Sequence, residues 1–194
     1  MRYFSPAILL SLLILTFLDT SCVKADGMDG NRSTLLTGTG RVLIVRHAMA
    51  PGTGDPGNFK IDDCSTQRNL DARGKKQAHT MGEWLRSQGV EQARVYSSQW
   101  CRCKDTAELM KLGPVTELPA LNSFYQRWDE KDSNISALQR FLSEQNADET
   151  LIVLVTHQVT ITALTGVYPA SGTGVLLFLD GKGHFDIGPT VQFE

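Results

Sequence analysis

The 194-residue chain has no strong excess of charge of either sign. Its 19 lysine and arginine residues nearly balance 21 aspartate and glutamate residues, which leaves a formal net charge of -2. This balance predicts neither a nucleic acid nor an anionic membrane surface as a partner. An anionic ligand would therefore have to be held by positive charge concentrated at one place in the fold.

The chain also lacks an apolar run long enough to cross a bilayer. The longest run, Ala7 to Leu18, falls short of the roughly 20 residues that a membrane-spanning helix needs. Its length, and the basic Arg2 before it, are typical of a signal peptide. We expect a signal peptide over residues 1–25, because Val23 and Ala25 occupy the -3 and -1 positions of a cleavage site.

Two alternatives for this leader stay open. Thr20-Ser21-Cys22 resembles the end of a lipoprotein signal, which would end before Cys22 and leave that cysteine acylated, although Asp19 stands where an aliphatic residue is expected. The run could also be kept as an anchor. All three readings predict an exported domain, periplasmic or secreted, and a lipid anchor only if Cys22 is acylated.

Paired Cys-x-x-Cys spacing, which is typical of structural zinc sites, is absent. The remaining cysteines are Cys64, Cys101 and Cys103, and an oxidising compartment permits one disulfide among them. We expect Cys64 to pair with either Cys101 or Cys103, which leaves one thiol free. The sequence predicts no metal and no other cofactor.

Strand and helix patterns alternate along the rest of the chain. Residues 26–40 are rich in glycine, serine, threonine and asparagine, and we interpret them as a flexible linker before one domain at 41–194. Residues 42–45 and 151–155 are continuous apolar runs, the pattern of strands buried on both faces. The alternation predicts an α/β three-layer sandwich, with a mostly parallel central sheet flanked by helices.

The remaining elements follow from local patterns. Asp71 caps a helix that Gly89 ends, and a long loop rich in glycine and proline, residues 50–69, precedes it. Asp180-Gly181 predicts a hairpin between the last two strands. Further strands are expected at 94–97 and 114–118, and further helices through residues 103–110, 135–142 and 158–164.

Both apolar strands are followed directly by a histidine, His47 after the first and His157 after the second. In open α/β sheets, ligands bind at the carboxyl ends of the strands. A neutral imidazole can attack phosphorus, provided that the phosphate charge is neutralised. Arg46 and Arg102 supply guanidinium groups that match phosphate oxygens, and a helix starting near Gln158 would point its amides at the same anion.

At these residues the sequence resembles the histidine phosphatase superfamily, branch 1, which has the phosphoglycerate mutase-like fold. Residues 45–48, Val-Arg-His-Ala, are similar to its Arg-His-Gly signature. Residues 69–78 resemble its Leu-Thr-x-x-Gly-x-x-Gln-Ala block, and residues 97–107 its Ser-Ser-x-x-x-Arg-x-x-x-Thr-Ala block. Residues 155–157 resemble its second-histidine motif. The four blocks stand in the family's order and cover about residues 41–165.

The resemblance implies a phosphatase that acts on a phosphomonoester through a phosphohistidine formed on His47. It implies that Arg46, Arg102 and His157 hold the transferred phosphoryl group, where each such donor is typically worth about 3 kcal/mol. The same side chains and Gln158 are the expected substrate-binding residues. The expected partner is a small phosphorylated substrate, such as an envelope sugar phosphate or a phosphoprotein, and not nucleic acid.

Two departures from the family pattern bear on function. Ala48 replaces the usual glycine, a mild change if the backbone there keeps a negative φ. The family usually has a glutamate as proton donor near residues 121–124, where this chain has no acid. The alternatives to a phosphatase are therefore a phosphate-binding or sensor protein with little catalysis, and a phosphomutase. The candidate donors are Asp55, Asp62, Asp63, Asp129, Glu130 and Asp132.

Overall fold

The computed structural model describes residue 1 and residues 35–193. Its centre is a six-stranded sheet with the strand order β3-β2-β4-β1-β5-β6. The strands are β1 (Arg41–Arg46), β2 (Arg94–Ser97), β3 (Val115–Glu117), β4 (Ile152–Thr156), β5 (Gly174–Leu179) and β6 (Phe185–Val191). The helices are α2 (Ala72–Ser87), α3 (Cys101–Met110), α4 (Lys131–Ser143) and α5 (Gln158–Thr165), with 3-10 turns η1 (Cys64–Thr66), η2 (Pro119–Leu121) and η3 (Trp128–Glu130).

The sheet is mixed. Strands β3, β2, β4 and β1 run parallel to one another, whereas β5 is antiparallel to β1 and β6 is antiparallel to β5. The predicted α/β fold with helices around a mostly parallel sheet is therefore confirmed. The two C-terminal strands form the antiparallel hairpin that Asp180-Gly181 indicated.

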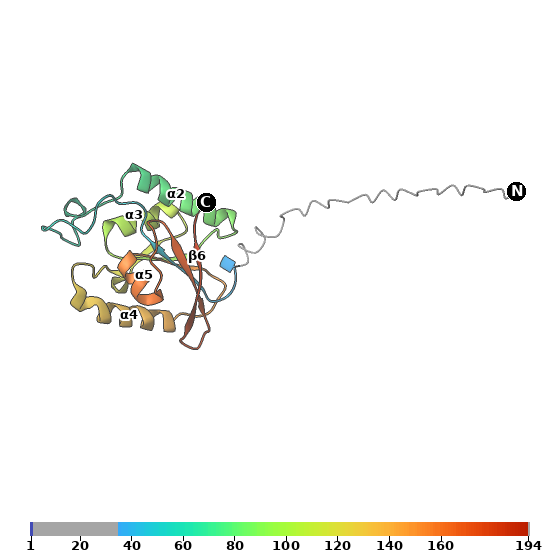
Figure 1. The fold of residues 1–194 in the computed structure, drawn as a ribbon. Helices are drawn as coiled ribbons and strands as arrows, with labels where there is room; N and C mark the ends of the chain where they lie inside the picture. The colour runs from blue at the N-terminus through green and yellow to red at the C-terminus, as the bar shows by residue number, and fades with distance from the viewer. Residues whose placement is uncertain (2–34, 194) are drawn as a thin grey trace.

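Helices cover both faces of the sheet (Figure 1). Leu43 and Val45 of β1 pack on the side of α2 and α3, whereas Val42 and Ile44 pack on the side of α4. All four side chains are fully buried, because each face of the strand meets its own helical layer. This explains why β1 is a continuous apolar run.

Helix α2 begins and ends close to where its sequence signals predict. Asp71 accepts a hydrogen bond from the amide of Gly74 at 2.7 Å, which caps the first turn. The predicted inner face is buried at Gly74, Ala78, Met81 and Leu85. The helix ends at Ser87, two residues before Gly89.

The packed domain begins before residue 41. Leu36 is only 1% exposed and belongs to the core beneath α2 and α3. The amide of Gly40 donates to the carbonyl of Asp148 at 2.9 Å. Residues 35–40 thus belong to the domain and not to a flexible linker, because the apolar side chain of Leu36 packs into the core although the segment around it is polar. Residues 2–34, which contain most of the predicted signal peptide, lie outside the described residues. Within the described part of the chain, no helix is both long and apolar enough to span a membrane.

Candidate active site

The register of two parallel strands brings the two predicted histidines together. Arg46 of β1 pairs with Thr156 of β4, so the next residue on each strand stands at the same edge of the sheet. The amide of His47 donates to the carbonyl of Thr156 at 2.9 Å, and the centroids of the His47 and His157 rings are 5.6 Å apart. Both side chains are almost fully buried.

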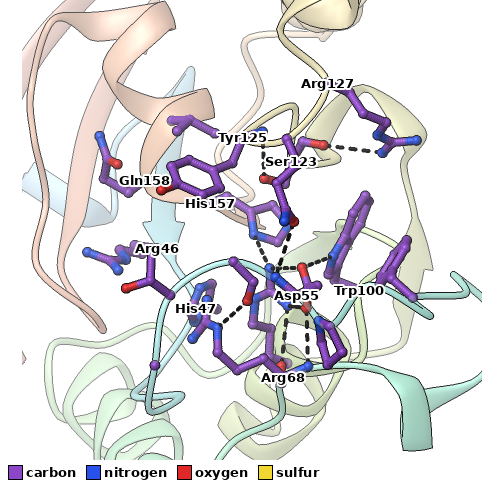
Figure 2. A pocket seen from close by; sticks show the side chains of 18 of the residues that line it. Arg46, His47, Asp55, Arg68, Trp100, Ser123, Tyr125, Arg127, His157 and Gln158 are labelled. Atoms are coloured by element: carbon purple, nitrogen blue, oxygen red, sulfur yellow. Dashed lines mark hydrogen bonds and ion pairs between the residues drawn. The ribbon is translucent and has the colours of Figure 1, made fainter.

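A cavity of about 470 Å³ opens over these histidines. All five residues that the sequence predicted for the site line it: Arg46, His47, Arg102, His157 and Gln158. Figure 2 shows Arg46 and His47 at the left, His157 near the centre above Asp55, and Arg68 at the bottom. The structure thus assembles in one place the residues that the four sequence blocks had indicated separately.

Hydrogen bonding places the proton on one nitrogen of the His47 ring. Nδ1 lies 2.7 Å from the carbonyl oxygen of Ala48, and a carbonyl oxygen can only accept, so Nδ1 carries the proton. Nε2 then has a free lone pair, and it has no hydrogen-bond partner among the described residues. Burial and the positive charge of Arg102 hold the pKa of His47 well below its usual range, so the ring is neutral at neutral pH. Such a ring is a competent nucleophile.

Side chains from two helices form hydrogen bonds with the backbone of the turn that follows His47. Thr106 of α3 accepts a hydrogen bond from the amide of Ala48 at 3.0 Å, and Gln77 of α2 accepts one from the amide of Met49 at 2.9 Å. Ala48 replaces the family's glycine without strain, because among the described residues only Lys111 has a positive φ without being glycine. Gly74 of α2 lies against Met49, where a Cβ would come within 1.9 Å of the Met49 carbonyl oxygen.

Arg102, in the first turn of α3, is 3% exposed and is held mainly by a carboxylate. Its Nη1 and Nη2 atoms donate to the two oxygens of Asp55, at 2.7 and 3.1 Å. Nη1 also donates to the carbonyl of Arg68 at 3.2 Å, and Nη2 makes a longer contact of 3.4 Å with Nδ1 of His157. The guanidinium therefore joins the loop at 50–69 to the second histidine.

Arg68 is a further guanidinium in the cavity and was not predicted, and neither was Arg127, which also lines it. Nε of Arg68 donates to the carbonyl of Gly54 at 2.9 Å, and Nη1 donates to the carbonyl of Ala50. Burial and the nearby Arg102 lower its pKa to about 10, so it remains positively charged at neutral pH. The only signal for it was an arginine in a loop rich in glycine and proline, just before the second sequence block. Arg46, held by a hydrogen bond from Nη1 to the carbonyl of Pro169, also places its charge near His47.

His157 is oriented by a chain of polar side chains. Because a guanidinium only donates, Nδ1 of His157 accepts from Arg102, and Nε2 carries the proton. Nε2 then donates to the hydroxyl of Ser98 at 2.9 Å, and that hydroxyl donates to the Asn122 side chain at 3.1 Å. Burial, Arg102 and His47 keep the pKa of His157 well below its usual range. Asn122 belongs to the segment where the family usually carries its acid, and here it supports the second histidine.

Of the six candidate proton donors, Asp55 alone lines the cavity. Its carboxylate accepts from Arg102 and also from the Arg68 amide and the Trp100 indole, at 3.1 and 3.0 Å. Burial tends to raise the pKa of Asp55, but these donors outweigh it and lower the pKa overall. Asp63 instead caps η1 through the amide of Ser65, and Glu130 pairs with Arg127. The other candidates, Asp62, Asp129 and Asp132, are exposed or outside the cavity lining.

The disulfide joins Cys64 to Cys101, which resolves the alternative that the sequence left open. It ties η1, within the loop at 50–69, to the residue that precedes Arg102. Cys103 keeps a free thiol that is fully buried, and burial raises its pKa to about 12. Its sulfur lies 3.5 Å from Nε2 of His157, so the thiol packs behind the site in its neutral form.

Polar and aromatic side chains line the outer part of the cavity. Tyr125 and Tyr168 are 42% and 75% exposed, and Ser123 and Gln158 lie deeper. Figure 2 shows Tyr125 and Gln158 on the side of His157 away from Asp55. Within residues 35–193, no cluster of histidine, cysteine and acidic side chains could hold a metal ion. The cavity is suited to a ligand whose anionic group lies beside His47 and the arginines and whose larger part lies beside the tyrosines.

Comparison with known proteins agrees with this geometry. Residues 42–137 match the family model of the histidine phosphatase superfamily, branch 1. No curated protein matches the chain by sequence. The protein histidine phosphatase SixA, solved in complex with tungstate, has a similar fold, with a TM-score of 0.56, 20% identity, and coverage of 79% of this chain and 97% of that chain.

Two further structures share the fold at low identity. A mycobacterial glucosyl-3-phosphoglycerate phosphatase, solved with VO3, is 16% identical with a TM-score of 0.59, covering 76% of this chain and 96% of that one. A phosphoserine phosphatase of Entamoeba histolytica is 12% identical with a TM-score of 0.53, covering 79% and 98%. At these identities the structures demonstrate the fold alone. The family match, the ordered blocks and the fold together establish that this chain belongs to branch 1 of the histidine phosphatase superfamily.

Proposed function

We propose that the protein is a phosphomonoesterase that works through a phosphohistidine on His47. The observation that carries the proposal is the hydrogen bond from Nδ1 of His47 to the Ala48 carbonyl, which leaves the Nε2 lone pair free in a cavity lined by four guanidinium groups. Two similar structures were solved with the oxyanions tungstate and VO3, which is consistent with an anion site in this fold. Two of the structures with a similar fold are phosphatases, one for glucosyl-3-phosphoglycerate and one for phosphoserine, which favours hydrolysis over simple binding.

The proposed reaction has two steps. In the first, the Nε2 lone pair of His47 bonds to phosphorus while the bond to the leaving oxygen breaks, and that oxygen takes up a proton. The proton stays on Nδ1, where its hydrogen bond to the Ala48 carbonyl stabilises the charge of the phosphorylated ring. In the second, water attacks phosphorus and gives up a proton to the solvent, the P–N bond breaks, and its electron pair returns to Nε2. Arg46, Arg102 and His157 stabilise the equatorial oxygens by position and charge.

The surroundings of Asp55 indicate which substrates react fastest. Its carboxylate accepts four hydrogen bonds and has a lowered pKa, so it is a poor proton donor. No other carboxyl group among the described residues lines the cavity. We therefore propose a preference for phosphoesters whose leaving group departs without protonation, such as aryl phosphates, over alkyl phosphates.

We further propose that the protein acts outside the cytoplasm. The apolar run at residues 7–18 supports this, and so does the pairing of Cys64 with Cys101, since disulfides persist in oxidising compartments. The test is to express the full chain, separate the cell fractions, and determine the N-terminal residue of the mature protein. A mature chain that begins at Asp26 supports the proposal, one that begins at an acylated Cys22 supports the lipid-anchored version, and an uncleaved cytoplasmic chain contradicts both.

Phosphoenzyme trapping tests the mechanism. The protein is mixed with labelled para-nitrophenyl phosphate and quenched, and the wild type is expected to carry acid-labile, base-stable label. His47→Ala should carry none and should release phosphate at least 10³-fold more slowly, an order of magnitude estimated from the loss of a nucleophile. His79→Ala is the matched control, because His79 is the same residue type on α2 and does not line the cavity.

The same experiment separates the competing functions. Label that persists in His47→Ala would overturn the assignment of the nucleophile. Tight binding of vanadate with no phosphate release between pH 4 and 8 would favour the phosphate-binding or sensor alternative. Phosphate release that requires a bisphosphate primer would favour a phosphomutase.

A further inference from the structure

Asp55 holds a central position in the cavity that no motif of the sequence explains. It lies in the loop at 50–69, and its side chain is 8% exposed beside an Arg102 side chain that is 3% exposed. Four donors converge on its two oxygens. Figure 2 shows Asp55 between Trp100 and the His47 side of the cavity. A carboxylate held this firmly fixes the orientation of the groups that contact it.

The ion pair uses a specific edge of Arg102. Both oxygens of Asp55 bind the end of the guanidinium that is formed by Nη1 and Nη2. A guanidinium also has a second fork, formed by Nε and the nearer Nη nitrogen. In Arg102, Nε is buried and has no hydrogen-bond partner among the described residues. Nη2 makes a 3.4 Å contact with Nδ1 of His157 in addition to its bond to Asp55, so the guanidinium links Asp55 to the second histidine.

We propose that Asp55 is a positioning residue for phosphoryl transfer. It binds both terminal nitrogens of Arg102 and so fixes the guanidinium, and through Nη2 the ring of His157, beside the phosphoryl group on His47. This inference rests on the proposed function, because it assigns Asp55 a part in the same site. It also excludes Asp55 as the proton donor, since a carboxylate engaged by four donors keeps its negative charge.

The loop around Asp55 is built to hold it in place. The indole of Trp100 donates to Asp55 and stacks on Phe59 of the same loop, with ring centroids 5.1 Å apart. The next residue, Cys101, is bonded to Cys64, and its amide donates to the side chain of Gln67 at 2.9 Å. The loop is thus attached to the start of α3 at three points that follow Asp55, which holds the carboxylate close to Arg102.

Replacement of Asp55 by asparagine tests the proposal. The first readouts are kcat/KM on para-nitrophenyl phosphate and on phenyl phosphate, which has the more basic leaving group. We expect D55N to lower both by a similar factor, about 10- to 100-fold, because a misplaced guanidinium weakens the transition state whatever the leaving group. The third readout is the affinity for vanadate, measured by isothermal titration calorimetry, which should fall by about the same factor.

The matched control is Asp63→Asn, which removes the same charge from the same loop. Asp63 caps η1 and does not line the cavity, so we expect changes of less than about 3-fold. Trp100→Phe is the milder variant if D55N fails to fold. It keeps an aromatic ring against Phe59 but removes one donor to Asp55, and it should shift all three readouts in the same direction by about 2- to 5-fold.

Three other outcomes would contradict the proposal. A loss confined to phenyl phosphate would make Asp55 the proton donor. Tighter binding of vanadate by D55N would show that Asp55 competes with the phosphoryl group for Arg102. Unchanged readouts in a folded D55N would remove Asp55 from the mechanism. A wild-type protein that binds vanadate without turnover would contradict the proposed function alone, because the vanadate affinities still test Asp55.

Discussion

At the scale of single residues, burial decides the charge of the groups that carry the chemistry. His47 and His157 lie among guanidinium groups at the edge of the sheet, and both have pKa values well below the usual range of histidine. Burial is the larger cause, and the positive charge of Arg102 is the next. The surroundings of His47 therefore keep the proposed nucleophile neutral. The same lowered pKa values make the free energy of unfolding depend on pH.

This arrangement predicts a pH dependence of stability. Below pH 6.5 the unfolded chain binds protons at these histidines that the folded chain does not bind, so the free energy of unfolding falls as pH falls. The slope should reach up to about 1.4 kcal/mol per pH unit for each histidine. Chemical denaturation of the wild type between pH 7 and pH 5 measures it. His157→Gln should reduce the slope by about half, and a wild type with no slope in this window would contradict the assignment.

At the scale of elements, the packing of helix α2 depends on two glycines that face different neighbours. A Cβ at Gly74 would come within 1.9 Å of the Met49 carbonyl oxygen, and one at Gly82 would come within 2.0 Å of the Met110 carbonyl oxygen. Met49 lies two residues after His47, whereas Met110 ends α3. The same helix thus supports the turn of the nucleophile at one position and packs against α3 at the other.

The two positions form a matched pair for mutation. We expect Gly74→Ala and Gly82→Ala each to lower the free energy of unfolding by about 1–3 kcal/mol, because an added methyl group forces backbone apart. Gly74→Ala should in addition lower kcat/KM about 10-fold or more, since it displaces the turn after His47. Denaturation curves and phosphatase assays on both variants check this. Equal activity losses in the two variants would contradict a specific link between Gly74 and the nucleophile.

At the scale of the whole molecule, one covalent bond ties the site loop to the body of the domain. Cys64 and Cys101 are separated by 37 residues in sequence, and the loop between them includes Arg68 and the whole of α2. Asp55 and Arg102 lie just outside this covalent ring, on its two sides. The disulfide therefore links the loop that carries Asp55 to the helix that carries Arg102.

Loss of this disulfide should affect both stability and activity. We expect the double variant Cys64→Ser/Cys101→Ser to lose roughly 2–4 kcal/mol of unfolding free energy, because closing a loop of this length restricts the unfolded chain. Its kcat/KM should fall as well, since the loop loses one of its attachments to α3. Reduction of the wild type with dithiothreitol should reproduce both effects. Unchanged activity in the reduced, folded protein would show that the noncovalent contacts of the loop suffice.

The sequence predicted most of the secondary structure, and the structure brings the four central candidate residues together in one cavity. The apolar runs that became β1 and β4, and the cap at Asp71, depend on neighbours within a few residues, so a local pattern is enough to identify them. The positions of His47 and His157 at strand ends followed from the same patterns. The boundary at residue 41 was wrong because the burial of Leu36 depends on distant core residues.

Local pattern thus specified an α/β fold, its strand ends and the neighbourhood of His47 in this protein. Tertiary contacts alone selected Cys101 over Cys103 as the partner of Cys64, added Arg68 to the cavity, and turned Asp55 from one of six possible acids into the counter-ion of Arg102. The physical reason is separation along the chain. Asp55 and Arg102 are 47 residues apart in sequence. A short-range sequence pattern cannot indicate which charged side chains from distant segments come into contact in the folded protein.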